Sequence, residues 1–171
     1  MGNRATVIFT DGKKSFSPAV YLHWNGGPES VYGFLEELNR RKARADQEYE
    51  CARFIELVGD FFDQDEFGST SLGVTNGPKS DKPEDLAKVN TDHSDNGFYL
   101  VNRTNNHMQV RRFIERHKGD WSKPDSVSFY LDEMSPEQVE QERLLAYKDN
   151  YGLLKDVFQK IAGERPVSKY G

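Results

Sequence analysis

The densest group of chemically capable side chains lies at residues 21–28, YLHWNGGP. His23 can exchange protons near neutral pH, Trp24 offers a stacking surface, and Asn25 both donates and accepts hydrogen bonds. Backbone amides at the start of a following helix attract anions, and the glycines permit close approach. The run lacks both a spaced glycine triplet and a Gly-Lys-Ser/Thr. The pattern favours a packed turn before a helix, with Trp24 and Asn25 as candidate binding residues.

A second group, Asp92-His93-Ser94-Asp95, lies in a polar stretch. Carboxylates next to an imidazole can hold a divalent metal or orient a general base. In an enzyme built from both groups, His23 would be the acid–base residue, Asp92 and His93 the metal-binding or orienting groups, and Asp95 a further candidate. Such short clusters are common in solvated loops, which the sequence favours here. The four histidines have no metal-binding spacing, so we predict no metal and no cofactor.

Basic residues form a third group, Arg40-Arg41-Lys42-Ala43-Arg44. Arg40, Arg41 and Arg44 are candidate ligands for a phosphate backbone, which makes a nucleic-acid-binding module a second alternative. Cations are also stabilising near the negative end of a helix dipole, and the sequence favours such a solvated helix end. A further basic run covers residues 111–118. If it begins on a strand, Arg111 and Arg112 face opposite sides and make no single patch.

Composition indicates one folded, acidic domain spanning residues 1–171. The chain is 36% hydrophobic and 30% charged with a net charge of −5, and aromatic residues make up 12%. Aromatic rings bury large areas and compensate for the polar remainder. A single cysteine, Cys51, excludes an intramolecular disulfide and fits a reducing compartment. No signal-peptide core and no apolar run of membrane-spanning length is present, so we expect a cytoplasmic protein without a membrane partner.

The first half of the chain predicts a hairpin and two helices. Alternating apolar residues over 4–24 flank Asp11-Gly12, a dipeptide typical of a tight type I′ turn. A helix begins at Pro28, and apolar stripes at residues 31–38 and 51–62 point in nearly opposite directions if the helix is continuous. Residues 39–50 therefore contain either a break, with Asp46 as N-cap, or the middle of one long helix. We favour the break. Cys51 falls on the second stripe and is interpreted as a buried hydrophobe.

The second half predicts more strands and a terminal helix. A short strand at 71–75 precedes a long polar loop, about residues 76–96, with one helical turn after Pro83. A hairpin of 98–101 with 107–113 follows, then a strand at 127–131. Ser135 caps a helix whose apolar residues repeat in a 4-3-4-3 pattern from Leu144 to Ile161 and which stops at Gly163. That stripe is expected to cover the sheet.

These elements predict an α+β fold, with an antiparallel or mixed sheet of about five strands packed by about three helices. Residues 21–28, which follow the predicted hairpin with its Asp11-Gly12 and Ser17-Pro18, are similar to the start of short uncharacterised proteins of bacteria and their mobile elements. The resemblance covers about the first 40 residues. It implies a bacterial or phage setting and no particular activity.

The sequence contains no recognisable catalytic motif, and its acidic and basic runs are segregated. Segregated charge favours electrostatically steered association. We therefore expect a small acidic interaction protein that binds another macromolecule, most simply a protein, and that acts on a host or defence component if the setting is a mobile element. The enzyme and the nucleic-acid-binding module are the alternatives.

Overall fold

The computed structural model describes residues 2–42, 44–62, 72–91, 95–103 and 107–164. They form one six-stranded sheet in the order β3-β2-β1-β4-β5-β6. The strands are β1 Ala5–Phe9, β2 Ala19–Leu22, β3 Leu72–Thr75, β4 Phe98–Asn102, β5 Gln109–Lys118 and β6 Ser128–Glu133. Only β1 and β4 pair in parallel. The α+β class and the mixed sheet are confirmed, with six strands rather than five.

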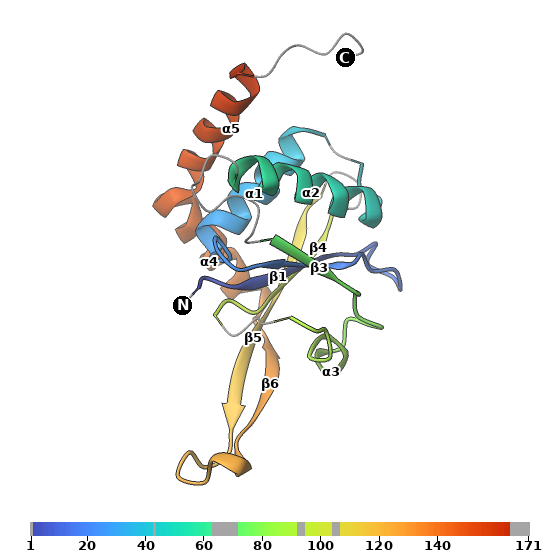
Figure 1. Cartoon of the computed structure of the whole chain (residues 1–171), viewed down its shortest axis with the longest axis vertical. Helices are drawn as coiled ribbons and strands as arrows, with labels where there is room; N and C mark the ends of the chain where they lie inside the picture. The colour runs from blue at the N-terminus through green and yellow to red at the C-terminus, as the bar shows by residue number, and fades with distance from the viewer. Residues whose placement is uncertain (1, 43, 63–71, 92–94, 104–106, 165–171) are drawn as a thin grey trace.

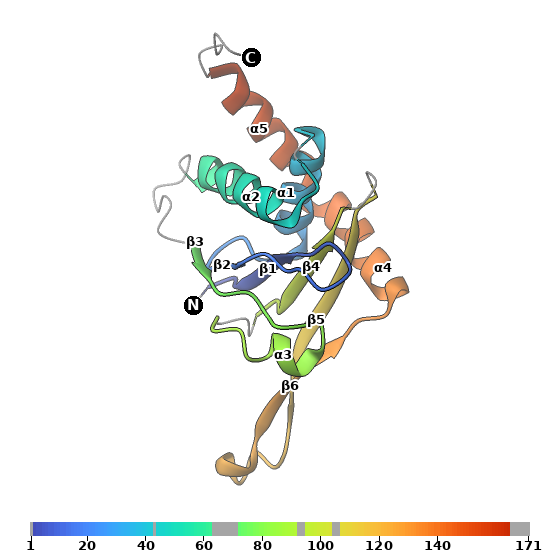
Figure 2. The same cartoon turned by 90° about the vertical axis from the view of Figure 1, so that its right-hand side faces the viewer.

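Helices lie on both faces of the sheet (Figures 1 and 2). On one side are α1 Pro28–Arg40, α2 Gln47–Phe62, α4 Pro136–Ala146 and α5 Gly152–Glu164, and on the other is the short α3 Pro83–Leu86. A π-helical segment, Tyr147–Tyr151, joins α4 to α5, and a 3₁₀ turn, Pro124–Ser126, lies between β5 and β6. More helices are present than the three expected, because the π-helical segment divides the terminal helix into α4 and α5 and because the turn after Pro83 forms the short α3.

The central strands are buried on both faces, which accounts for their continuous apolar sequence. Val7 and Phe9 of β1 belong to the main core with α1, α2 and α5. Ile8 points the other way, into a smaller core with Leu86 of α3 and Phe113 of β5. The alternation follows from the two-residue period of a strand.

The break between the first two helices is confirmed. α1 ends at Arg40 and α2 begins at Gln47. The Asp46 carbonyl accepts the first helical bond, from the Glu50 amide at 2.9 Å, while its carboxylate binds Arg44. The break lets both apolar stripes face the same core, with Phe54 contacting Phe34 of α1 and Phe9 of β1.

The predicted type I′ turn at Asp11-Gly12 was wrong. Gly12 has a φ of 77°, but Asp11 is outside the positive-φ region that both central residues of such a turn require. The Asp11 carboxylate instead accepts hydrogen bonds from the Lys13 and Ser15 amides. This side-chain capping holds a longer loop, which ends in a bridge between Thr10 and Phe16.

The C-terminal helix also differs from the prediction. The π-helical segment shifts the apolar stripe, so that Leu144 and Tyr147 are 51% and 64% exposed. Beyond it, Leu154, Phe158 and Ile161 are buried in the main core, where the Phe158 ring contacts Phe34 of α1. The stripe therefore covers α1 and α2 rather than the sheet, and the helix ends at Glu164, one residue beyond Gly163.

A buried arginine connects the sheet to α4. Arg112 of β5 is 1% exposed, and its Nε donates to Glu142 of α4 at 2.7 Å. Its Nη1 donates to the carbonyls of Asn96 and Phe98, and the guanidinium lies 3.8 Å from the centre of the Tyr99 ring. The charge thus has a carboxylate, two carbonyls and an aromatic face around it.

Two tyrosines extend this network to α1. The Tyr32 hydroxyl donates to Glu142 at 3.0 Å, and the Tyr99 hydroxyl donates to the Gly26 carbonyl at 2.8 Å. Glu142 therefore accepts from both the sheet and α1. Because its loss would leave a buried guanidinium without its carboxylate, the network sets the position of α4.

A second buried pair lies where α2 meets the residues that follow β4. Glu50 is completely buried, and its Oε1 is 3.2 Å from Arg103 Nη1. Arg103 Nη2 also donates to Asn39 at 3.2 Å. Burial raises the pKa of Glu50 to about 7, and the positive charge of Arg103 opposes this rise without overcoming it.

We predict that Glu142→Gln destabilises the protein by about 2–4 kcal/mol, because it removes the carboxylate that balances a buried guanidinium. Urea unfolding followed by circular dichroism measures this. Glu140→Gln is the matched control, since Glu140 is 56% exposed and its one ion pair among the described residues is with Arg143 on its own helix. Its cost is expected below about 0.5 kcal/mol. Equal effects of the two substitutions would contradict the prediction.

We also predict a pH dependence that arises from Glu50. Its folded pKa is above the ordinary value of 4.5, so the folded state binds more protons between pH 4.5 and about 7. Stability contributed by Glu50 is therefore present below that window and is lost as the pH rises through it. The free energy of unfolding of the wild type, relative to Glu50→Gln, should fall by up to about 3 kcal/mol from pH 4.5 to 8. If the difference in free energy of unfolding between the wild type and Glu50→Gln stays constant or rises with pH, the raised pKa of Glu50 is refuted.

Candidate functional site

The predicted His23 turn is a well-packed structure at the end of β2. His23 Nδ1 and the Tyr21 hydroxyl are hydrogen-bonded at 2.9 Å, and the His23 ring meets the Trp24 ring edge-on at 5.4 Å. Asn25 has a φ of 60°, and its side chain donates to Ser30 at 3.0 Å. Trp24 is 39% exposed. The histidine and asparagine are thus held by their own neighbours.

The structure brings Asp95 into the same neighbourhood. The Asp95 carboxylate accepts from both Arg4 Nε and the Arg4 amide, at 2.9 and 3.0 Å. The neighbouring Asn3 amide donates to the His23 carbonyl at 2.9 Å. The hydrogen bond from the Arg4 side chain is the main reason that the pKa of Asp95 is lowered. Asp95 is therefore held as a carboxylate in an ion pair.

The enzyme alternative remains a prediction. Asp92 and His93 lie outside the described residues. Of the five cavities described, none is lined by His23 or Asp95. Within the described parts of the chain, no group of three or more histidine, cysteine, aspartate and glutamate side chains is placed to hold a metal ion.

The arginines of the first basic run bind carboxylates of the protein itself. Arg40 and Arg41 both donate to Glu37, with Nε–oxygen distances of 2.8 and 2.9 Å. Arg44 pairs with Asp46 and lies 4.0 Å from the centre of the Tyr49 ring. Arg41 also pairs with Asp60, so each of the three guanidinium groups contacts at least one carboxylate of the protein itself.

The second basic run divides between the two faces of β5. Arg112 points into the network described above, whereas Arg111 binds Glu133 and Asp81 on the other face. This is the separation expected of adjacent residues on a strand.

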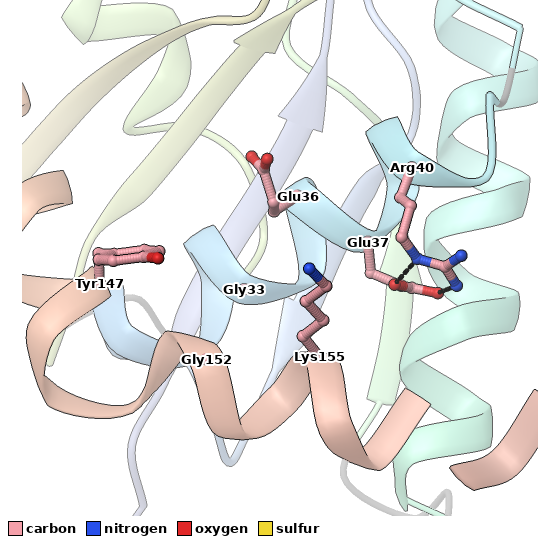
Figure 3. Close-up of a pocket in the computed structure, with 7 residues that line it drawn as sticks. All are labelled: Gly33, Glu36, Glu37, Arg40, Tyr147, Gly152 and Lys155. Carbon is pink, nitrogen blue, oxygen red and sulfur yellow. Dashed lines mark hydrogen bonds and ion pairs between the residues drawn. The ribbon is translucent and has the colours of Figure 1, made fainter. Parts of the chain in front are cut away.

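One cavity of about 310 Å³ lies between α1 and the start of α5. In Figure 3, Tyr147 and Lys155 stand on one side and the Glu37–Arg40 ion pair on the other, with Gly33 and Gly152 forming its walls. Its lining supplies an amine, a phenol, the guanidinium of Arg40 and the carboxylates of Glu36 and Glu37, of which Glu37 is paired with Arg40.

The most exposed aromatic surface is on the long hairpin of β5 and β6. Residues 116–130, here called the arm, extend away from the body of the protein beyond the last core residues (Figures 1 and 2). Trp121 near its tip is 69% exposed, and Phe129 and Tyr130 are 44% and 42% exposed. Three large aromatic side chains thus lie on a two-stranded ribbon that has no helix of its own to cover it.

The arm has two different faces. Directly opposite residues in an antiparallel pair share a face, and His117 is opposite Phe129. The His117 ring also contacts Trp121, with 5.5 Å between centroids, so these three form an aromatic face. On the other face Arg116 is opposite Tyr130, and Lys118 Nζ lies 5.6 Å from the Tyr130 ring centre.

Sequence reasoning missed the arm. It ended the earlier strand at 113, although β5 continues to Lys118, and it did not pair this strand with β6. The available signal was the turn-forming cluster of residues 119–126 between two strand-like segments. The charged run from Glu115 to Lys118 concealed it, because a strand exposed on both faces has no apolar alternation.

Comparison with protein-family models, with curated proteins and with solved structures finds no match for this chain. Within the part of the chain that the structure describes, no helix combines the length and the hydrophobicity that crossing a membrane would require.

Proposed function

We propose that this protein is a small acidic binding factor that docks on another protein through the aromatic face of its arm. The proposal includes a cytoplasmic location in a bacterial or phage setting, where the partner is a host or defence component. The observation that carries it is the exposure of Trp121 and Phe129 together on a projecting hairpin.

Exposing these rings to water on a free hairpin is unfavourable. A two-stranded hairpin is only marginally stable in water without a surface to pack on. Trp and Phe side chains each bury on the order of 150–250 Å² when covered. Tryptophan is also enriched among the few residues that dominate binding energies at protein interfaces. An arm with exposed rings is accordingly suited to entering a groove on a partner.

Charge favours a protein partner over a nucleic acid. The arm carries three basic and two acidic side chains, for a net charge of +1 in a chain of net −5. Binding to a phosphate backbone requires several cations that displace counterions together. The arginines proposed for that role from the sequence are instead paired with Glu37 and Asp46.

We predict that Trp121→Ser with Phe129→Ser weakens partner binding more than tenfold, because it removes two aromatic anchors. The wild type, immobilised and exposed to an extract of bacterial cells, should retain a partner that the double variant does not retain. Thermal unfolding should show little change, since both side chains are already exposed.

Val74→Ser is the matched control, because Val74 is 55% exposed on β3 at the opposite edge of the sheet. It should retain the partner as the wild type does. Retention of the same proteins by the arm variant, or by none of the forms, would count against the proposal.

A further inference from the structure

We propose that two copies of this chain form an arm-exchanged dimer, in which the cationic face of each arm docks in an acidic groove beside α4 of the other copy. This contact uses Arg116, Lys118 and Tyr130, on the face of the arm opposite to the aromatic face assigned above to a partner protein. It is therefore separable from the proposed function.

The groove has an apolar floor and an acidic rim. It is a shallow hollow of about 410 Å³ bordered by Met134 and Leu145, and Leu145 is 60% exposed. The described residues that line it carry three carboxylates, Glu29, Glu142 and Asp149, and no cation. Glu142 is neutralised by Arg112, whereas Glu29 and Asp149 have no ion pair among the described residues. The groove thus offers two uncompensated negative charges around an exposed leucine.

The arm supplies the complementary surface. Lys118 has no carboxylate partner among the described residues and lies over the half-exposed Tyr130 ring. Arg116 pairs with Asp132 at 3.6 Å, with both side chains 55% exposed, which is a weak contact in water. Lys123 adds a third exposed cation at the tip. Lys118 and the Tyr130 ring on the arm are therefore complementary to a carboxylate such as Asp149 and to the apolar Leu145 in the groove.

The groove and the cationic face lie on the same side of the molecule. Arg112 and Arg116 are four residues apart on β5 and so point to one face, and Arg112 binds Glu142 of α4 there. Met134 immediately follows β6, which places the groove at the base of the arm. Pairing of Lys118 with Ser128 keeps the two strands joined to the end of β5, so the arm stays extended and does not fold back on its own groove (Figure 2).

A second copy satisfies both surfaces at once. Two arms laid antiparallel bring the cationic face of each against the base of the other, where the groove lies. A two-fold axis makes the contact self-complementary and closes the assembly, so both arms and both grooves are covered without leaving a free end.

Charge reversal tests this arrangement. Analytical ultracentrifugation of the wild type at micromolar concentrations should show a dimer that weakens as salt is added. Variant X carries Lys118→Glu and Lys123→Glu in the arm, and variant Y carries Gln141→Lys and Asp149→Lys in the groove. Each alone should dimerise at least tenfold more weakly. A mixture of X and Y should recover a heterodimer, because the acidic arm of X meets the basic groove of Y and the basic arm of Y meets the acidic groove of X.

Lys14→Glu with Lys82→Glu is the control for net charge, because both residues are exposed and lie outside the arm and the groove. It should dimerise as the wild type does. A monomeric wild type, or X and Y variants that dimerise normally or fail to recover when mixed, would overturn the proposal. Partner capture that depends on Trp121 and Phe129 would be unaffected by such a result, so the two proposals fail separately.

Discussion

The fold depends on one buried guanidinium. Arg112 projects from the sheet into the space below α4, and its charge is balanced only because Glu142, two carbonyls and the Tyr99 ring surround it. Burying a charge is costly unless the geometry of its partners is right. The free-energy cost of burying Arg112 is therefore offset only when α4 places Glu142 next to β5. Because Tyr32 also donates to Glu142, the position of α1 is fixed as well. Apolar packing alone would tolerate a range of α4 positions.

The arm is a consequence of where that packing ends. Up to Phe113 and Leu131 the hairpin is buried against α3 and the neighbouring strands, and beyond them it has nothing to pack on. The exposed aromatic and cationic side chains of the arm lie outside both hydrophobic cores, so they contribute little to the stability of the fold. Surplus apolar surface of this kind marks an interaction site more often than a structural need.

Most candidate functional residues that the sequence indicated form ion pairs or hydrogen bonds with other groups of the same chain. The arginines of the basic run are bound by Glu37 and Asp46, Asp95 is bound by Arg4, and His23 is held by Tyr21. Each of these side chains is ion-paired or hydrogen-bonded within the protein. The arm carries three exposed aromatic side chains, Trp121, Phe129 and Tyr130.

Local patterns in the sequence determined the element types and most boundaries: the helix break near Asp46, the capping box at Ser135 and the alternation in β1 each depend on residues within one or two turns. Tertiary structure alone decided the rest. The partners of Arg112 and Glu50 lie 30 and 53 residues away along the chain, and the pairing of β5 with β6 beyond the core joins two separate strands. The periodicity of apolar residues indicates which side of a helix or strand is buried, but it does not identify the element that packs against that side. Ion pairs between elements and hairpins that extend beyond the core depend on that packing partner.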